Sequence, residues 1–270
     1  MTRRQNLNNA TGSESAVSGG LNERRATVAG ISMRWFESSG NGTPVVLLHG
    51  IPTSPLLWRQ VVQQLEGCRV FAWEMVGYGG SWSVEDDKDI SVRAQASYLQ
   101  TWLDDQRLDD VILVGHDLGG GVAQIAAVQA RQRVAGIVLA NSISYDSWPL
   151  PSVKAMRAMG SLVGKLPRSM FRRLLGGFLK SGHEDAAIAS ESIDTHWRYY
   201  DRKDGAATFV RQIRSLDAAD TLSIAPKLPE LHIPGRVVWG ADDKFQKLRY
   251  GERLARDLGL ELDVIAGGKH

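Results

Sequence analysis

The sequence predicts an α/β protein built on a mainly parallel sheet, with helices on both faces and an inserted helical cap. Three observations support this prediction. Short apolar runs of strand length alternate with amphipathic helical segments along most of the chain. One of these runs, residues 111–114, leads through a glycine-rich turn directly into a helical segment. Finally, the stretch 144–225 contains no clear buried strand, and about 80 residues is long for a single crossover.

Each element follows from a local pattern. Short runs rich in branched or aromatic apolar residues predict strands at 24–28, 31–36, 45–48, 69–73, 111–114, 136–141, 236–239 and 260–265. Apolar residues at helical spacing predict helices at 58–65, 91–107, 122–130 and 248–258. The first two strands are separated by Ala29-Gly30, which suits a hairpin turn.

These elements divide the chain into three regions. Residues 1–20 are rich in Asn, Ser, Thr and Gly and have almost nothing to bury, so we expect a disordered leader. The alternating strands and helices assign residues 21–143 and 226–270 to one α/β core. Residues 144–225, with amphipathic segments at 153–163 and 171–179, form the predicted helical cap.

Composition excludes several classes of function. A net charge of +2 without a basic run gives no reason to expect a nucleic-acid partner. No apolar run approaches the roughly 18 residues of a membrane span, and the N-terminus lacks the apolar region of a signal peptide. The single cysteine, Cys68, lies in an apolar run and is interpreted as a small core residue. We therefore expect a cytoplasmic protein that uses neither a metal nor a cofactor.

The stretch 111–121 organises the rest of the chain. A buried strand, a tight glycine turn and a helix follow one another, with Asp117 at the tip of the turn. This is the setting of a nucleophile elbow, in which flanking glycines let the backbone turn sharply and expose one side chain. Asp also suits a helix N-cap, and glycine-rich turns also bind phosphate, although no Lys follows here.

This stretch resembles the α/β-hydrolase fold, in the branch with an aspartate nucleophile that holds epoxide hydrolases and haloalkane dehalogenases. The resemblance covers about residues 25–270. His49-Gly50-Ile51-Pro52 resembles the family's oxyanion-hole loop, so the resemblance implies that the backbone N–H groups of Ile51 and Leu118 bind an oxyanion. His49 is then a structural residue that holds the loop. The loop that begins at Glu74 also matches the family, with Glu in place of the usual Asp.

The same resemblance implies a catalytic triad of Asp117, Asp243 and His270. The order nucleophile, acid, histidine is the order of this fold, and each residue follows a predicted strand. The pattern W-G-x-x-D selects Asp243 over its neighbour Asp242 as the acid. Family members usually continue with another helix after the histidine, whereas this sequence stops at His270, so we expect this histidine to be weakly held.

An aspartate nucleophile indicates a particular chemistry. A carboxylate attacks esters poorly, because the resulting mixed anhydride is unstable. It can instead displace a leaving group from a saturated carbon and form an alkyl-enzyme ester. His270, oriented by Asp243, would then activate water to hydrolyse that ester. The expected partners are therefore a small apolar organic substrate and water.

The leaving group stays open between epoxide oxygen and halide, and a different C–O or ester substrate is a further alternative. Haloalkane dehalogenases typically bind halide with a Trp after the nucleophile and an Asn in the oxyanion loop, where this chain has Leu118 and Ile51. Fluoroacetate dehalogenases carry an Arg after the nucleophile, which Leu118 cannot replace. Epoxide hydrolases protonate the opening ring with cap tyrosines, and this chain offers Tyr145, Tyr199 and Tyr200.

We therefore expect epoxide hydrolysis first and dehalogenation second, with a ligand-binding protein on a hydrolase frame as a third alternative. A carboxylate nucleophile needs a site that excludes water. We expect an apolar pocket beneath the cap, lined by some of the aromatic residues Trp148, Trp197, Tyr199 and Tyr200. Aromatic side chains mostly serve packing, so Tyr199 and Tyr200 are also candidates for the core of the cap.

Overall fold

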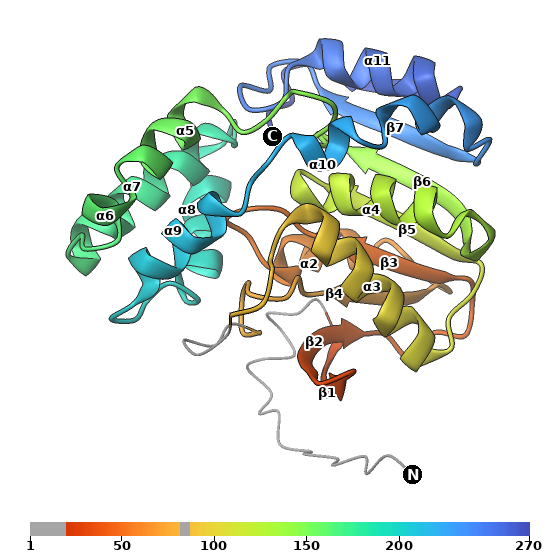
Figure 1. Cartoon of the computed structure of the whole chain (residues 1–270), viewed down its shortest axis with the longest axis horizontal. Coiled ribbons are helices and arrows are strands. Elements are labelled where there is room, and N and C mark those ends of the chain that lie inside the picture. The colour runs from red at the N-terminus through yellow and green to blue at the C-terminus, as the bar shows by residue number, and fades with distance from the viewer. Residues whose placement is uncertain (1–19, 82–86) are drawn as a thin grey trace.

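The computed structural model describes residues 20–81 and 87–270. In this part of the chain one eight-stranded sheet runs through the molecule in the order β1-β2-β4-β3-β5-β6-β7-β8 (Figure 1). Its strands β1 and β2 form the expected hairpin, and β2 pairs antiparallel with β4. All later neighbours pair in parallel, which confirms the predicted mainly parallel sheet. The leader expected at residues 1–20 lies, except for Gly20, outside the described residues.

The strands agree with the predicted ones to within a few residues. They are β1 Asn22–Val28, β2 Ile31–Glu37, β3 Pro44–Leu48, β4 Arg69–Trp73, β5 Val111–His116, β6 Val134–Ala140, β7 Gly235–Gly240 and β8 Glu261–Ile265. The helices of the core are η1 Pro55–Trp58, α2 Arg59–Val62, α3 Val92–Gln106, α4 Leu118–Gln129, η2 Arg131–Arg133, η3 Ala225–Glu230 and α11 Leu248–Leu258. Those of the segment 144–225 are α5 Pro151–Ala158, α6 Gly160–Val163, α7 Arg168–Ser181, α8 Ala186–Trp197, α9 Gly205–Arg214 and α10 Ala219–Leu222.

Side chains alternate between the two faces of the sheet, so each strand contributes side chains to two apolar layers. On one face the strands pack against helices α3 and α4 through Val46, Leu48, Phe71, Trp73, Trp102 and Val122. On the opposite face they pack against η1 through Val45, Leu47, Val70, Ala72, Leu56 and Trp58. The prediction of helices on both faces is therefore confirmed.

Three helix predictions need correction. The helix expected at 58–65 is split into η1 and a one-turn α2, and the chain then turns at Gly67, whose φ is +77°. Helix α4 begins at Leu118 rather than at 122, directly after Asp117. The amphipathic segment 153–163 breaks at Met159 into α5 and α6.

Residues 144–225 are all described and contain helices but no strand. Figure 1 shows α5–α9 gathered beyond one edge of the sheet, with the C-terminus between this group and the sheet. Helix α10 lies instead beside the core, next to α4. The insertion thus stands at the edge where the parallel strands end, which is where ligands bind in open α/β sheets.

Candidate active site

Asp117 stands at the sharp turn between β5 and α4, with φ of 52° and ψ of −120°. A non-glycine residue adopts such a backbone only when its surroundings hold it there. Here the Asp117 carbonyl oxygen accepts hydrogen bonds from the N–H groups of Gly120 and Ile143, both at 3.1 Å. A Cβ atom on Gly119 would lie 2.1 Å from the Leu48 carbonyl oxygen, so only glycine lets α4 approach β3 this closely.

The Asp117 carboxylate does not act as a helix cap. It makes no capping hydrogen bond to α4, although it occupies the N-cap position. Its Oδ1 instead accepts a 2.9 Å hydrogen bond from the Ile51 N–H of the loop after β3. The side chain therefore points away from its own helix, toward the loops at the carboxyl ends of the strands.

The structure brings Asp117, Asp243 and His270 together at one edge of the sheet. The Nδ1 atom of His270 lies 2.8 Å from Asp243 Oδ2, and its Nε2 atom lies 3.6 Å from Asp117 Oδ2. Asp117 follows β5, Asp243 follows β7 and His270 follows β8, and the carboxyl ends of these parallel strands share that edge. Asp242, the weaker candidate for the acid, is exposed, and only its backbone N–H is bonded, to the Gly268 carbonyl oxygen.

Asp243 is held by four donors. Its Oδ1 accepts hydrogen bonds from the backbone N–H groups of Phe245 and Gln246, at 2.7 and 3.0 Å. Its Oδ2 accepts a hydrogen bond from Asn141 Nδ2 in addition to that from His270. Asn141 was not predicted from the sequence, where the available signal was a polar residue directly after the apolar run of β6. The structure shows that this residue is buried.

His270 is held more firmly than its position in the sequence suggested, and it is only 12% exposed. Its backbone N–H donates to the Gly182 carbonyl oxygen at 3.1 Å, at the end of α7. The neighbouring Lys269 donates from Nζ to the His183 carbonyl oxygen at 2.9 Å. The imidazole lies between two rings, with centroids 4.5 Å from His116 and 5.0 Å from Phe245. The expectation of a weakly held histidine is therefore wrong.

The charges of the three groups depend on one another. Burial lowers the pKa of His270, but hydrogen bonds and charges from Asp117 and Asp243 outweigh it and raise the pKa to about 9. Burial raises the pKa of each carboxyl group, and the bond and charge of His270 outweigh it and hold both pKa values below their ordinary range. At neutral pH the site therefore holds an imidazolium between two carboxylates.

His116, directly before Asp117, is neutral, whereas His270 is protonated. Burial and the positive charge of His270 lower the pKa of His116 to about 3, so this imidazole is neutral. Its Nδ1 atom is buried and has no hydrogen-bond partner. A neutral ring against His270 avoids a second positive charge in the site.

His49 holds the loop that carries Ile51. Its Nδ1 atom lies 2.9 Å from the Gly50 carbonyl oxygen, and its Nε2 atom accepts a 3.1 Å hydrogen bond from the Met75 N–H. Burial lowers the pKa of His49 to about 4, so the ring is neutral and can accept that bond. Leu118 opens α4, where a backbone N–H has no acceptor within the helix. The Ile51 N–H thus meets the Asp117 side chain from the preceding loop, and the Leu118 N–H follows Asp117 at the start of α4.

Glu74 begins the loop after β4 and forms a buried ion pair with Arg34 on β2. Burial raises the pKa of Glu74, but the charge and hydrogen bonds of Arg34 outweigh it and hold the pKa below its ordinary value. The Arg34 guanidinium also donates to the Tyr199 hydroxyl at 3.0 Å. This cluster fastens the end of α8 to the sheet.

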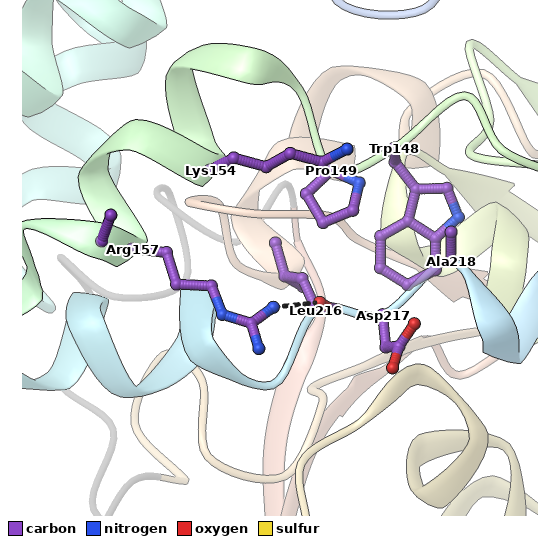
Figure 2. A pocket seen from close by; sticks show the side chains of 8 residues that line it. Trp148, Pro149, Lys154, Arg157, Leu216, Asp217 and Ala218 are labelled. Atoms are coloured by element: carbon purple, nitrogen blue, oxygen red, sulfur yellow. Dashed lines mark hydrogen bonds between the residues drawn. The ribbon is translucent and has the colours of Figure 1, made fainter.

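The aromatic residues expected around a pocket have other partners. Trp148 lines a cavity of about 480 Å³ beside α5, together with Lys154, Arg157 and Asp217 (Figure 2). Its indole N–H donates to Thr221 Oγ1 at 2.8 Å. Trp197 packs on the Phe171 ring.

The tyrosine hydroxyls are also bonded. Tyr200 donates to Gln212 Oε1 at 2.7 Å, and Tyr145 donates to Asp257 Oδ2 at 2.6 Å. The Tyr199 hydroxyl is the one bonded to Arg34. Neither Trp197 nor these tyrosines line the cavity of Figure 2 or the second cavity described next.

A second cavity, of about 460 Å³, lies between α5, α7, α9 and the loop after β7. Its lining is mostly apolar and includes Phe245, the residue whose ring meets His270. The sequence analysis missed Phe245, which lies two residues after the predicted acid.

Among the described residues, no group of three or more His, Cys, Asp or Glu side chains is arranged to hold a metal ion. No helix in the part of the chain that the structure describes has the length and apolarity to cross a membrane.

Fold and site together define a class of protein. Its members have a mainly parallel α/β sheet, an acidic residue at a strand–helix elbow and a histidine–acid pair beside that residue. Residues 43–270 match the family described as the alpha/beta hydrolase fold, and the chain belongs to this family of hydrolases. It is 35% identical over 116 residues to a haloalkane dehalogenase of Agrobacterium fabrum, covering 41% of this chain and 38% of that protein. It is 29% identical over 191 residues to epoxide hydrolase A of Mycobacterium tuberculosis, covering 63% of this chain and 59% of that protein.

The chain thus spans between 38% and 59% of the length of these curated relatives. A solved alpha/beta hydrolase fold protein from Burkholderia ambifaria superposes with a TM-score of 0.79 at 23% identity, over 92% of this chain and 91% of that one. At this identity the likeness shows the fold alone.

Proposed function

We propose that this protein hydrolyses epoxides through a covalent alkyl-enzyme ester on Asp117. The observation that carries the proposal is the placement of one histidine between two carboxylates, with Nδ1 on Asp243 and Nε2 toward Asp117. In this proposal residues 21–143 and 226–270 are the catalytic core. The helices of residues 144–225 act as a cap that keeps water from the nucleophile.

In the first step an Asp117 carboxylate oxygen attacks a ring carbon of the epoxide. A carbon–oxygen bond forms, and the ring carbon–oxygen bond breaks with its electron pair on the leaving oxygen. That oxygen departs opposite the nucleophile, so the proton it needs passes to it from the His270 imidazolium through water. The products of this step are a hydroxyalkyl ester and a neutral histidine.

Ester formation removes one negative charge from the site, and this lowers the proton affinity of His270. Asp117 loses its negative charge, and this charge is one of the two that hold the proton on His270. The pKa of His270 therefore falls once the ester has formed. A group that is an acid in the resting enzyme becomes a base when water must be activated.

In the second step His270 takes a proton from water, and the hydroxide adds to the Asp117 carbonyl carbon. The Ile51 and Leu118 N–H groups stabilise the resulting oxyanion, and the loss of one such donor costs about 3 kcal/mol. The acyl carbon–oxygen bond then breaks and the diol leaves. The histidine proton goes to the diol oxygen, and the acid regenerated at Asp117 returns a proton to His270, so the cycle is balanced.

The side chains beside Asp117 favour an epoxide oxygen over a halide as the leaving group. A halide ion needs N–H donors, and the side chains of Ile51 and Leu118 have none. An epoxide oxygen is protonated as it leaves, so it does not need a preformed anion site. The match to a dehalogenase favours carbon–halogen hydrolysis as the second candidate.

We assign Trp197 and Tyr200 to the packing of the cap and Tyr199 to its attachment to the sheet, because each has a partner within the protein. Trp148, whose indole N–H is bonded to Thr221, lines the cavity of Figure 2.

A substrate screen tests the proposal. Purified protein is incubated with styrene oxide and with 1-bromobutane, and diol and bromide are measured. We expect diol release that is lost in Asp117→Asn and Asp243→Asn. It should stay near the parent rate in Asp242→Asn, a matched control at an exposed neighbouring carboxylate. Bromide release without diol would favour the dehalogenase. Binding without turnover of either compound would support a ligand-binding protein.

A further inference from the structure

The stretch between Asp146 and Glu184 is strongly basic. It holds seven Lys or Arg residues and no Asp or Glu, whereas the whole chain has a net charge of only +2. The rest of the chain is therefore net negative. The stretch includes α5, α6 and α7, and Figure 1 shows α6 and α7 on the side of the helical insertion that lies away from the sheet. These helices thus carry an excess of positive charge.

Neighbouring carboxylates neutralise only part of this charge. Arg168 forms an ion pair with Asp201, and Arg172 forms one with Asp194 at 2.7 Å. Both pairs are exposed to solvent, so they are weak and are screened by salt. The other cations of the stretch form no ion pair with any described residue, and they are Lys154, Arg157, Lys165, Arg173 and Lys180.

Two of these cations lie near an acidic side chain and two do not. Lys154 and Arg157 line the cavity of Figure 2, whose wall also contains Asp217. Lys165 lies in the turn between α6 and α7, and Arg173 lies on the exposed side of α7. Both Lys165 and Arg173 are exposed, so their charges are available to an anionic partner.

Apolar side chains stand exposed among these cations. Met159 is 51% exposed, Leu162 66%, Met170 55% and Leu174 37%. These are four of the nine large apolar side chains that are exposed in the described part of the chain, so such side chains gather in this stretch. A single exposed apolar residue needs no explanation, whereas a group of them marks a surface that meets an apolar partner.

Packing against α9 sets which side of these helices faces solvent. Helices α5, α6 and α7 each contact α9. On α7 the Phe171 ring meets the Phe209 ring of α9 at a centroid distance of 5.7 Å. Met170, Arg173 and Leu174 lie on a different side of α7, where spacings of three and four residues place them together. The exposed side of α7 therefore combines a cation with two apolar side chains.

We propose that this side of the insertion binds the surface of a membrane that contains anionic lipids. The binding face is formed by Met159, Leu162, Lys165, Met170, Arg173 and Leu174. The negative surface of such a membrane attracts Lys and Arg side chains. Exposed aliphatic side chains gain by entering the boundary between headgroups and acyl chains, and this mode of binding needs no membrane-spanning helix. The proposal does not depend on the reaction at Asp117.

Charge and apolarity together favour a lipid surface over other occupants. A second copy of this chain, if the face paired with itself, would place like charges against one another. A nucleic acid would attract the cations through its phosphates, but it offers no apolar layer to the exposed Met and Leu side chains. A membrane surface with anionic lipids satisfies both kinds of side chain.

Vesicle binding tests the proposal. The parent protein is incubated with vesicles of phosphatidylcholine alone and with vesicles of phosphatidylcholine mixed equally with phosphatidylserine, and the bound protein is measured by sedimentation. We expect binding to the mixed vesicles that weakens as salt is raised, because salt screens the attraction. Absence of binding to the mixed vesicles, or equal binding to both kinds, would overturn the proposal.

Two paired substitutions test the two kinds of side chain separately. Lys165→Gln with Arg173→Gln removes two charges and should weaken binding to the mixed vesicles at least roughly tenfold, because each basic residue near such a surface strengthens binding about fivefold. Leu162→Gln with Met170→Gln removes two exposed apolar groups and should also weaken this binding at least roughly tenfold. Unchanged binding in either variant would contradict the proposed face.

A matched control changes the same residue types outside this face. Leu222→Gln with Lys227→Gln removes an exposed leucine and an exposed lysine beside the core, and this variant should bind the mixed vesicles as the parent does. All the substituted side chains are exposed, so the thermal midpoints of the three variants should stay near that of the parent.

Two further results would assign the face to a different occupant and overturn the proposal. If the charge variant loses binding while Leu162→Gln with Met170→Gln keeps it, the partner is a polyanion such as a nucleic acid. If sedimentation velocity shows a dimer of the parent that the Leu162→Gln, Met170→Gln variant lacks, the face pairs with a second copy of the chain.

Discussion

The charge of His270 makes the stability of the fold depend on pH in a defined direction. Its pKa is raised from the ordinary value of 6.5 to about 9, because two carboxylates outweigh the effect of burial. A raised pKa stabilises the folded state fully below pH 6.5. That contribution is lost as the pH rises through about 9.

The size of this effect follows from the two pKa values. Each tenfold change in proton affinity corresponds to about 1.4 kcal/mol, so a rise from 6.5 to about 9 contributes on the order of 3 kcal/mol. Replacing His270 by Gln removes the titration and keeps a polar side chain of similar length. The difference in unfolding free energy between the parent and His270→Gln should therefore shrink by about 3 kcal/mol between pH 6.5 and 9.5.

Urea unfolding of both proteins at several pH values measures this difference. Other groups titrate in the same range, but they are common to both proteins and cancel in the comparison. A difference that stays constant from pH 6.5 to 9.5 would refute the imidazolium between two carboxylates. A difference that grows with pH would mean that the pKa of His270 is lowered.

Three other substitutions test separate parts of the structure. Asn141→Ala removes a donor from Asp243 and should lower kcat roughly tenfold to a hundredfold, with little change in KM, as steady-state kinetics would reveal. Gly119→Ala forces α4 away from β3 and should lower the unfolding free energy by about 2 kcal/mol in urea titrations. Arg34→Met leaves the Glu74 charge buried without its partner and should cost about 3–5 kcal/mol, part of which the second change Glu74→Gln should restore.

Local patterns were sufficient to predict the sheet. Each buried strand is a short apolar run whose neighbours in sequence are glycines or polar residues, and such runs are recognisable without knowledge of their partners. The elbow at Asp117 was also predictable, because the glycines after it signal a turn that other residues would block. The proximity of the three predicted triad residues followed from their positions after parallel strands that end at one edge.

Contacts between distant parts of the chain could not be predicted in the same way. Asn141 and Asp243 are 102 residues apart, and no local pattern links them. The aromatic residues of 144–225 were recognisable as buried, but amphipathic spacing does not say against which residue a side chain packs. Tyr199, for example, bonds to Arg34, which lies 165 residues earlier. The cavity that Phe245 lines was missed for the same reason, because α5, α7, α9 and Phe245 form it jointly.

A single turnover in water enriched with ¹⁸O tests the ester on Asp117 most directly. Excess enzyme is mixed with styrene oxide, and both the diol and the proteolytic peptides are examined by mass spectrometry. In the proposed mechanism the water oxygen enters the Asp117 carboxylate, and the first diol carries only oxygens from the substrate and the enzyme. We expect label in the peptide that contains Asp117 and an unlabelled first diol. Label in that diol, with none on Asp117, would refute an ester on Asp117.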